Sequence, residues 1–323
     1  MSNLICKICA NSLNNKTHIV QERMLGIRES FNYMECSNCG CLQLSDPPKE
    51  MGKYYPTDKY YSFAISTLSP FKKKVKTFMI GHLMKYYTGA LTVPGYFLSL
   101  FYHFKKHYGW VKNLKSIPTT ASILDIGSGS GKYLLELHHI GFHNITGIDP
   151  YNTEVLHLNK DIIIYNKQLS EIHQTFDFIM MNHSLEHMED QHLVFSQLFK
   201  LLNPNGKILI RIPVMGGESW RKYNINWFQI DAPRHYFLHT LKSFEILAHK
   251  HGFQTQSVDF DSNDYQFIFS EQYTKNKIMS DPYFFNNKEI KAFRKRADYL
   301  NSINDGDQAS FIINKIDMFF RNE

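Results

Sequence analysis

From residue 121 onward the chain alternates short apolar runs with helix-like segments, and this alternation restricts the fold more than any other feature. Two stretches, 132–139 and 191–202, have the apolar spacing of helices. The apolar runs that read as strands are 121–126, 145–148, 162–165, 176–182 and 206–214. Consecutive strand–helix–strand units are joined by right-handed crossovers. The sequence therefore predicts an α/β fold with a mostly parallel sheet that carries helices on both faces.

The segment after these strands predicts one reversed strand. A helix is expected at 241–252, followed by strand-like runs at 254–260 and 266–272. Only a short polar turn separates the two runs, so we expect a hairpin whose last strand runs antiparallel to its neighbours. The tail, 276–323, is expected to form one or two helices.

The strand that ends at residue 126 leads into a glycine-rich loop, Gly127-Ser-Gly129-Ser-Gly131. Such a loop turns tightly and presents the free N–H groups of a helix N-terminus to a ligand. Asp125 lies beside the loop and would repel a pyrophosphate, so it favours a ligand with an amine or sulfonium group. Asp149, at the end of the second strand, is placed to accept hydrogen bonds from ribose hydroxyls. Together these residues predict an adenosine site with a cationic tail.

With these motifs the sequence resembles the class I S-adenosylmethionine-dependent methyltransferases. The matching segments are LDIGSGSGKYLLEL (124–137), GIDP (147–150), FDFIMMNHSLEHMED (176–190) and LLNPNGKILIRIP (201–213). The resemblance implies a Rossmann-like sheet of seven strands with an antiparallel last strand, and S-adenosylmethionine as the methyl donor. An NAD-binding fold is the alternative, and both Asp125 and the NHSLEH run fit it less well.

The resemblance also implies roles for individual residues in donor binding. Gly127, Gly129 and Gly131 would surround the methionine part, and Asp149 would bind the ribose. Asp125 would act through water or through hydrogen bonds to the loop. The remaining implied donor contacts are Gln168 and Leu169 beside the adenine and Asn182 near the amino-acid end.

The N-terminal region contains two CxxC pairs, Cys6 with Cys9 and Cys36 with Cys39. Four thiolates complete a tetrahedral structural zinc site, and a strand pair at 18–24 and 30–35 fits between the two pairs. A disulfide or a redox-active CxxC is the alternative. Cys41 is left over as a packing or surface thiol.

A four-cysteine region, then YYPTDKYY, then this core resembles a family of bacterial methyltransferases of sugar and cell-surface polysaccharide biosynthesis. That resemblance implies a sugar or sugar-bearing small molecule as the acceptor, carried on a nucleotide or a lipid. We therefore divide the chain into a zinc-binding region, a basic aromatic helical segment, a methyltransferase core with an inserted substrate loop, and C-terminal helices. The corresponding ranges are 1–60, 61–118, 119–275 with the insertion 215–239, and 276–323.

The insertion 215–239 leaves the carboxyl end of the sheet, where ligands bind in open α/β folds, so we expect it to form a substrate wall. Trp220 and Trp227 offer flat faces for sugar rings, and Arg221 and Arg234 suit phosphate. The alternative is that the aromatic residues only pack the loop onto the core.

Two histidines are candidates for the group that removes the acceptor's proton. His183 follows the fourth strand directly, and His235 lies in the ProArgHis stretch of the insertion. The alternative for each is a structural role. An amine acceptor would need no base.

The chain's positive charge is concentrated in one segment. The net charge is +6, yet residues 70–116 contain nine Lys and no Arg, Asp or Glu, so the remainder is net negative. This segment favours a phosphate-bearing or membrane-surface partner over a nucleic acid. It is interpreted as a substrate lid or as a surface-binding element, with solvated lysines as the alternative.

Composition and the N-terminus indicate the compartment. The 323 residues are 43% hydrophobic, which rules out disorder as the main state. The first ten residues lack the layout of a secretion signal, and the longest uncharged stretch is broken by Gly89, Pro94 and Gly95, so no spanning helix is expected. We expect a cytoplasmic protein, free in the cytoplasm or at the inner membrane face. Two competing functions are an RNA base methyltransferase with a zinc knuckle and a non-catalytic S-adenosylmethionine-binding scaffold.

Overall fold

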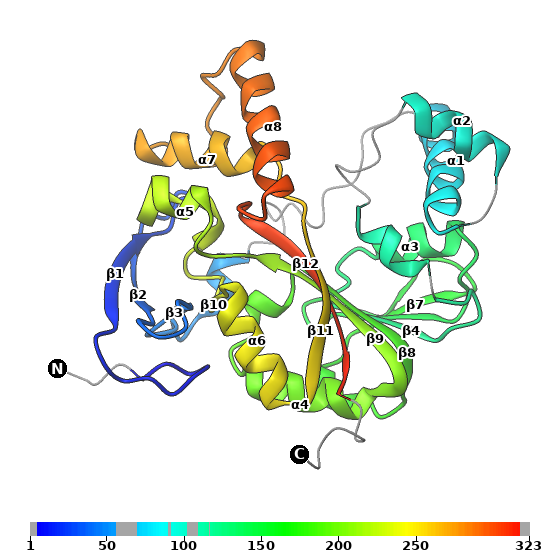
Figure 1. Cartoon of the computed structure of the whole chain (residues 1–323), viewed down its shortest axis with the longest axis horizontal. Coiled ribbons are helices and arrows are strands. Elements are labelled where there is room, and N and C mark those ends of the chain that lie inside the picture. The colour runs from blue at the N-terminus through cyan, green and yellow to red at the C-terminus, as the bar shows by residue number, and fades with distance from the viewer. Residues whose placement is uncertain (1–4, 56–69, 90–91, 102–108, 116, 317–323) are drawn as a thin grey trace. The chain divides into compact units, whose positions relative to one another are not determined.

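The computed structural model describes residues 5–55, 70–89, 92–101, 109–115 and 117–316. The larger of its two sheets has eight strands in the order β11-β12-β9-β8-β4-β5-β7-β6 (Figure 1). The five strands expected in the core are present as β4 (Ile123–Ile126), β5 (Ile145–Ile148), β7 (Ile162–Tyr165), β8 (Phe176–Asn182) and β9 (Leu202–Pro213). Strand β4 pairs in parallel with β5 and β8, and β5 pairs in parallel with β7. The predicted α/β fold with a mostly parallel sheet is thereby confirmed.

The sheet has one strand more than the seven predicted. The additional strand, β6 (Leu156–His157), is two residues long and pairs antiparallel with β7. The core helices match the sequence pattern closely: α3 (Lys132–His139), α4 (Gln191–Leu201) and α6 (Leu241–Lys250). Helix α6 starts at a reciprocal cap, because the Thr240 hydroxyl accepts from the Ser243 N–H and the Ser243 hydroxyl accepts from the Thr240 N–H.

The predicted hairpin at the end of the core is wrong. Residues 266–272 belong to a helix, α7 (Tyr265–Thr274), and not to a strand. Helix α7 is buried on most sides, and a short apolar run buried all round has no periodicity that separates helix from strand.

The reversed strand comes instead from the tail that was predicted to be helical. Helix α8 (Asn287–Ser302) agrees with that prediction, but β12 (Gln308–Lys315) is a strand and pairs antiparallel with β11 (Phe253–Phe260). The core therefore extends beyond residue 275, to residue 315. The sequence correctly predicted that the last strand runs antiparallel, but it assigned that strand to residues 266–272 and not to residues 308–315.

A second sheet contains the N-terminal strands in the order β1-β2-β3-β10. The expected strand pair is confirmed, because β1 (Lys16–Gln21) and β2 (Ser30–Glu35) pair antiparallel. Strand β3 (Leu42–Leu44) follows, after which a 3-10 turn, η1 (Met51–Tyr54), ends the described N-terminal part. The fourth strand, β10 (Phe237–Leu238), comes from the insertion and pairs antiparallel with β3. The N-terminal region and the insertion thus build one sheet together.

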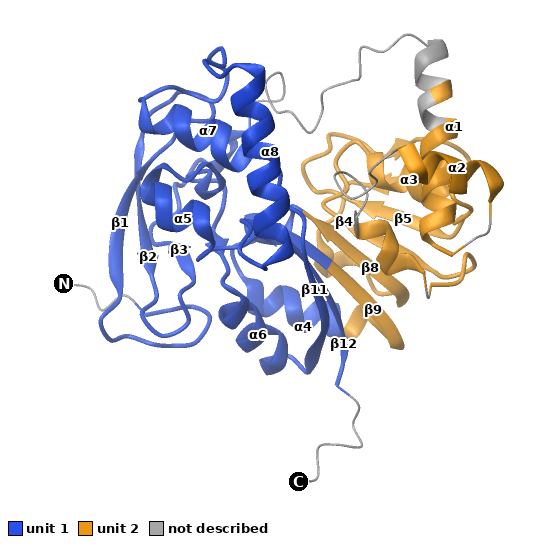
Figure 2. Ribbon diagram, turned by 45° about the horizontal axis from the view of Figure 1, so that its top comes forward, with its two compact units in different colours: residues 1–59, 183–199, 210–323 blue, residues 60–182, 200–209 orange. Residues whose placement is uncertain are grey.

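The chain divides into two compact units (Figure 2). Unit 1 contains residues 1–59, 183–199 and 210–323, and unit 2 contains residues 60–182 and 200–209. Strand β9 contributes residues to both. The donor loop belongs to unit 2, and the N-terminal sheet, the insertion and the C-terminal strands belong to unit 1.

The segment before the core is helical where it is described. It contains α1 (Pro70–Tyr87), α2 (Val93–Phe101) and the 3-10 helix η4 (Gly109–Leu114). Helices α1 and α2 approach closely at Gly95, where a Cβ would lie 2.4 Å from the His82 carbonyl oxygen. Residues 56–69, with most of the YYPTDKYY stretch, and Lys105 and Lys106 lie outside the described residues. Among the described residues, no helix has both the length and the hydropathy that crossing a bilayer requires.

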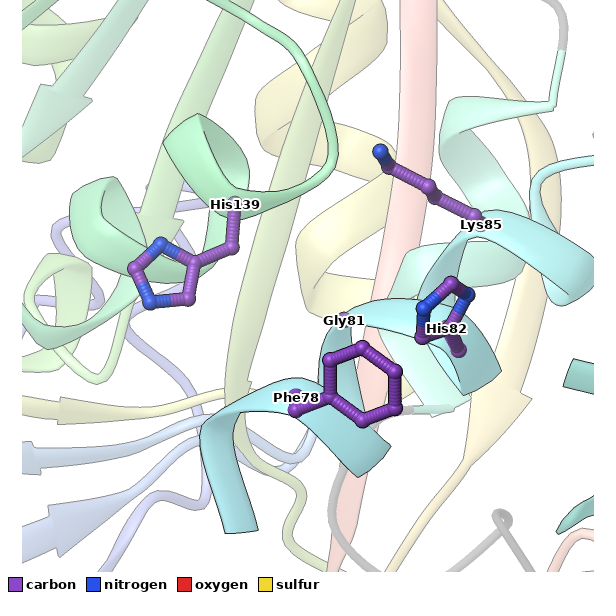
Figure 3. Close-up of a pocket in the computed structure, with 5 residues that line it drawn as sticks. All are labelled: Phe78, Gly81, His82, Lys85 and His139. Carbon is purple, nitrogen blue, oxygen red and sulfur yellow. The ribbon is translucent and has the colours of Figure 1, made fainter. Parts of the chain in front are cut away.

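A pocket in unit 2 lies beside α1 (Figure 3). Its lining residues are Phe78, Gly81, His82, Lys85 and His139. None of the residues predicted to bind the methyl donor lines it.

Candidate functional site

The donor loop between β4 and α3 has the backbone conformation that its glycines permit. Gly127, Gly129 and Gly131 all have positive φ angles, of 75°, 50° and 74°. At Gly131 a Cβ would lie 2.4 Å from the Cδ1 of Leu158, so a side chain is excluded there. At Gly129 nothing lies within 4 Å of the position that a Cβ would take, so the loop borders open space at that residue.

Asp149 holds this loop in place. Its Oδ2 accepts a hydrogen bond of 2.8 Å from the Gly129 N–H, and its Oδ1 accepts one of 2.9 Å from the Tyr151 N–H. Each carboxylate oxygen has room for a further donor. Asp149 is therefore a loop-organising residue that retains acceptor capacity for a pair of hydroxyl groups.

Two other predicted donor residues have unsatisfied polar atoms. Asp125 is 1% exposed, and its Oδ2 has no hydrogen-bond partner among the described residues. Burial, and then the charge of Asp149, raises the pKa of Asp125 to about 7. Asn182 is also buried, and neither atom of its amide is bonded within the described structure. Buried polar atoms without partners are uncommon, so they mark a place where a polar ligand would be stabilising.

Gln168 and Leu169 lie at the start of a 3-10 turn, η5 (Leu169–Glu171), after β7. The Gln168 N–H donates to the Glu171 carboxylate over 2.6 Å, and Leu169 is buried. Their predicted contact with adenine stays a prediction. All eight predicted donor residues belong to unit 2.

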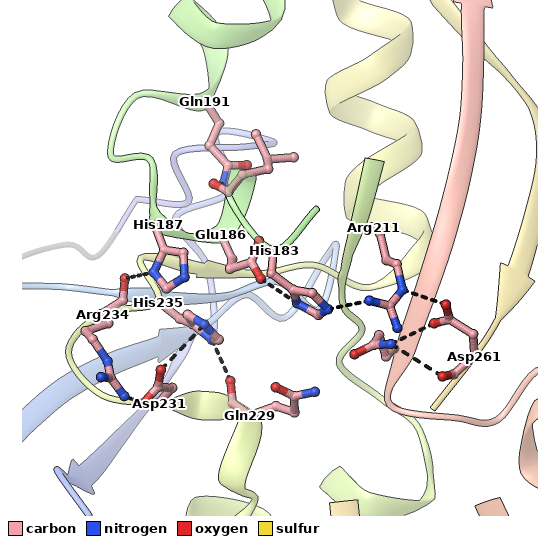
Figure 4. A network of polar contacts seen from close by, with 12 residues as sticks. His183, Glu186, His187, Gln191, Arg211, Gln229, Asp231, Arg234, His235 and Asp261 are labelled. Atoms are coloured by element: carbon pink, nitrogen blue, oxygen red, sulfur yellow. Dashed lines mark hydrogen bonds and ion pairs between the residues drawn. The ribbon is translucent and has the colours of Figure 1, made fainter. Parts of the chain in front are cut away.

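Unit 1 contains a second polar site, which we call the imidazole cluster: His183, Glu186, His187 and His235 (Figure 4). The 3-10 turn η6 (Leu185–His187) supplies Glu186 and His187. His235 follows a tight turn in which Asp231 pairs with the guanidinium of Arg234. The cluster is thus built from two chain segments about fifty residues apart.

Both ring nitrogens of His183 are bonded to neighbouring side chains. Arg211 donates to the His183 Nε2 over 3.0 Å, so Nε2 is the acceptor and Nδ1 carries the hydrogen. That Nδ1–H then donates to the Glu186 carboxylate over 3.1 Å. His183 also has a φ of 53°, a conformation that non-glycine residues rarely adopt. Because its lone pair is already used, this arrangement opposes the predicted role of His183 as proton acceptor.

His187 and His235 have the opposite arrangement. The Nδ1 of His187 lies 3.0 Å from the Arg234 carbonyl, and the Nδ1 of His235 lies 2.7 Å from the Gln229 carbonyl. Carbonyl oxygens only accept, so Nδ1 carries a hydrogen in both rings, and in the neutral ring Nε2 is the nitrogen that has the lone pair. Burial, and then the neighbouring His235, lowers the pKa of His187 to about 4. The predicted candidate His235 therefore has a lone pair available, which His183 lacks.

Glu186 is the buried acid of the cluster, with 1% of its surface exposed. Burial opposes its ionisation, but the hydrogen bond from His183 and the nearby imidazoles lower its pKa to about 2. Its Oε2 has no partner among the described residues. The sequence analysis named none of Glu186, His187 and Arg211 as site residues. The available signal was the acid–histidine pair in SLEH, directly after the fourth strand.

The four predicted substrate residues of the insertion have structural partners. Trp220 on α5 (Glu218–Tyr223) and Trp227, between η7 (Asn224–Asn226) and η8 (Phe228–Ile230), are 8% and 1% exposed. They pack in the core of unit 1, and the Trp227 indole donates to Asp307 over 3.0 Å. The prediction that these rings present open faces to a sugar is therefore wrong.

The two arginines are likewise paired with acids. Arg221 forms a two-pronged ion pair with Asp305, at 2.9 and 2.6 Å, on the surface. Arg234 is 1% exposed and pairs with Asp231. The burial of Arg234 contradicts its predicted role as a phosphate ligand. Arg221 could bind a phosphate only after its ion pair with Asp305 is broken.

The four predicted cysteines come together at one point in unit 1. Their Sγ atoms all lie within 4.8 Å of one another, with Cys6 to Cys39 at 3.6 Å and Cys9 to Cys36 at 3.5 Å. A tetrahedral zinc–thiolate site has sulfur atoms about 3.8 Å apart. All five cysteines are free thiols in the described structure.

Contacts around the cysteines favour a thiolate at Cys6, whereas burial raises the pKa of Cys9 and the contact with Cys6 raises that of Cys39. Gln43 donates to the Cys6 Sγ over 2.8 Å, and the N–H groups of Cys9 and Cys39 point to Sγ atoms at 3.5 Å. The contact with Cys39 is the main cause that lowers the pKa of Cys6 to about 4. Cys41, the remaining thiol, is fully buried. The residues thus fit a divalent ion with four sulfur ligands.

The cysteine region is also connected to the imidazole cluster within unit 1. The Tyr33 hydroxyl on β2 donates to the His235 carbonyl over 2.9 Å, and the Leu44 N–H on β3 donates to the Tyr236 carbonyl. The Thr240 hydroxyl donates to the Cys39 carbonyl over 2.6 Å. The position of His235 therefore depends on the sheet that the cysteines close.

Comparisons with known proteins find similarity to methyltransferases over part of the chain. Residues 104–258 match a family model described as a methyltransferase domain. Phosphoethanolamine N-methyltransferase 2 of Caenorhabditis elegans is 30% identical over 163 residues, which is 45% of this chain and 36% of that protein. EEF1A lysine methyltransferase 2 of Homo sapiens is 50% identical over 54 residues, which is 17% of this chain and 22% of that protein. The chain thus spans about a third or less of the length of these curated relatives.

Among solved structures, an S-adenosylmethionine-dependent methyltransferase from Archaeoglobus fulgidus has a TM-score of 0.42 and 20% identity. The match covers 65% of this chain and 92% of that one. The family-model match does not include the cysteines. Over residues 104–258 the chain is similar to a methyltransferase domain, in agreement with the enzyme class predicted from the sequence.

Proposed function

We propose that the protein transfers the methyl group of S-adenosylmethionine to a sugar or to a sugar-bearing small molecule. The observation that carries the donor part is the pair of unsatisfied buried groups in unit 2, the Asp125 carboxylate and the Asn182 amide. A sulfonium donor with an ammonium group is a cation, so a buried carboxylate attracts it. The glycine loop and Asp149 supply the remaining contacts, with the methionine part at the loop and the ribose at Asp149.

Calorimetry tests donor binding directly. We expect the purified protein to bind S-adenosylmethionine and its demethylated product, and Asp149→Asn to weaken both by about 10- to 100-fold, because hydrogen bonds to a charged group contribute roughly 1.5–3 kcal/mol. Arg221→Gln is the matched control, since Arg221 is on the surface of unit 1. Equal affinity in the wild type and in Asp149→Asn would contradict the proposed ribose contact.

The sugar acceptor rests on the resemblance of the four-cysteine region and the core to sugar methyltransferases. The acceptor hydroxyl or acidic carbon must lose a proton, and His235 has the free Nε2 lone pair for this. Isotopically labelled methyl donor supplied with cell extract, followed by mass spectrometry of the product, identifies the acceptor. Label in protein or nucleic acid, and none in small molecules, would contradict a sugar acceptor.

An amine acceptor is the second candidate. The curated relatives that the chain matches are named as an N-methyltransferase and a lysine methyltransferase. An amine with a free lone pair needs no base, so this candidate predicts that His235→Gln retains most of its turnover.

We further propose that Cys6, Cys9, Cys36 and Cys39 hold a structural zinc ion. Zinc bound by four thiolates has no open position, so it would stabilise the N-terminal sheet without taking part in chemistry. Free thiols suit a reducing compartment, in keeping with a cytoplasmic location.

The helical segment before the core is proposed to contact a membrane surface or a lipid-linked acceptor. Helix α2 exposes large apolar side chains, with Val93 at 71%, Phe97 at 57% and Phe101 at 82%. An exposed apolar helix face in a lysine-rich segment of the sequence is typical of interfacial binding. Sedimentation with vesicles that contain anionic lipid tests this, and Phe97→Ser with Phe101→Ser should reduce binding. Unchanged sedimentation of that variant would assign the segment to another role.

A further inference from the structure

Three side chains of the imidazole cluster converge with atoms that could bind a metal ion. Glu186, His187 and His235 each offer one ligand atom, and these atoms lie within 4.8 Å of one another (Figure 4). All three residues belong to unit 1. Glu186 and His235 are 1% and 5% exposed, so water does not readily satisfy them.

The tautomers of the two histidines are fixed by the backbone. Each Nδ1–H donates to a carbonyl oxygen, that of Arg234 or that of Gln229, which leaves each Nε2 as a lone pair. The Tyr55 hydroxyl also lies 3.1 Å from the Nδ1 of His187 and can accept from the same N–H. No hydrogen bond reaches either Nε2 among the described residues. Histidines that bind metals almost always donate their other ring N–H in this way.

The carboxylate supplies the independent observation. Glu186 Oε1 accepts from His183, but Oε2 is buried and has no partner in the described structure. A buried carboxylate oxygen without a hydrogen-bond partner is unfavourable unless a cation or a proton satisfies it. A cation bound by Glu186 would satisfy this oxygen.

The charged groups around the cluster permit a cation. Arg234 is neutralised by Asp231, and Arg211 is neutralised by Asp261 at 2.5 Å. Asp231 also places a carboxylate oxygen 3.7 Å from the His235 Nε2. Both arginines are therefore paired with acids other than Glu186.

We propose that Glu186, His187 and His235 bind a divalent first-row transition ion, with zinc as the natural candidate. Two imidazoles and a carboxylate are a typical ligand set for such ions, and three protein ligands leave a position for the oxygen of a water or an acceptor. Bonds of about 2.1 Å hold ligand atoms roughly 3.4 Å apart, so binding requires a closure of at most about 1.5 Å. The site is distinct from the four cysteines and goes beyond the proposed methyl transfer. With the ion bound, the Nε2 of His235 would be a ligand and could not take the acceptor's proton, so the metal site is an alternative to the role of His235 as general base.

A further cluster of possible metal ligands in the described residues gives weaker support for a metal site. His138, His143 and Asp161 also converge, but the acid already bonds to His138 over 2.9 Å, and the His143 side chain is 63% exposed. None of these three side chains is among the described residues that have a buried polar atom without a hydrogen-bond partner. It therefore serves as the control for adventitious binding.

Metal counting tests the proposal in the full chain. The protein is stripped with chelator, loaded with excess zinc, passed through gel filtration and analysed by mass spectrometry for metal. We expect about one ion per chain beyond the cysteine-bound ion. Glu186→Gln and His235→Gln should each lose that ion and keep the other, with affinity for the lost ion at least about 100-fold weaker. His143→Gln should retain both.

Loss of the additional ion only in His143→Gln, or its retention in Glu186→Gln, would overturn the proposal. Circular dichroism and calorimetric binding of S-adenosylmethionine show whether the variants are folded. Crystals of the wild type soaked in cobalt give a result that does not depend on variants: an anomalous peak between Glu186, His187 and His235 supports the site, and its absence while cobalt binds elsewhere refutes it. Failure of donor binding would instead contradict the proposed function, and it leaves the metal count unaffected.

Discussion

The donor loop of unit 2 and the imidazole cluster of unit 1 are built in different ways. The loop, Asp125, Asp149 and Asn182 come from one stretch of about sixty residues, and each lies at the end of a parallel strand. The cluster combines a turn after β8, a turn in the insertion and Arg211 on β9. The loop is defined by local backbone conformation, whereas the cluster is defined by hydrogen bonds between distant segments. A local site should tolerate damage to the rest of the chain better than an assembled one.

Removal of the cysteine-bound ion is expected to have the largest effect. Binding of structural zinc contributes on the order of 10 kcal/mol. Cys36→Ser should abolish turnover, because β2 and β3 hold His235 through Tyr33 and Leu44. Donor affinity, measured by calorimetry, should change less than about threefold, because the loop is in unit 2. A variant that loses donor binding as completely as turnover would remove the distinction between the two sites.

Substituting each of the two candidate histidines separately should distinguish their roles. His235→Gln should lower turnover by about 100-fold or more, the range of general base catalysis. His183→Gln should lower it by less than about tenfold, because the lone pair of His183 is used by Arg211. Steady-state kinetics with the identified acceptor measures both. A larger loss of turnover in His183→Gln than in His235→Gln would identify His183 as the proton acceptor.

The pKa of Asp125 should make stability depend on pH. Its value rises from 3.8 to about 7 on folding, so the folded state holds the proton more tightly than the unfolded state. Stability should therefore fall as pH rises from about 4 to 7, by on the order of 4 kcal/mol in total. Asp125→Asn carries no charge and should remove that part of the fall.

Urea unfolding at pH 5 and pH 8 measures the effect of Asp125→Asn. The variant should lose less stability between the two pH values than the wild type does. At pH 8 the variant should also bind S-adenosylmethionine more weakly, since the ionised carboxylate is missing. An identical pH dependence in both proteins would show that Asp125 is ionised at little cost.

The smallest expected effect is that of Arg221→Gln. Its ion pair with Asp305 is exposed, and such pairs contribute about 0–1 kcal/mol. Thermal unfolding should shift by a few degrees at most, with unchanged turnover. A large fall in turnover would support the predicted role of Arg221 in binding the substrate.

The apolar periodicity of the sequence predicted most strands and helices of the core correctly. Strands β5, β7 and β8 and helix α3 begin and end where the apolar patterns predict, because a buried strand between helices leaves a clear local signal. Helix α7 and strand β12 were misassigned. Both are short and almost entirely buried, so the choice between helix and strand depended on their neighbours and not on their own pattern.

The sequence by itself determined the loop glycines, the two acids beside them and the four cysteines, since each rests on spacing within a short motif. Only the tertiary structure decided that the tryptophans face the core, that Arg211 occupies the lone pair of His183, and that His187 joins His235. These outcomes depend on which distant groups donate and accept hydrogen bonds. Residue spacing along a chain does not contain that information.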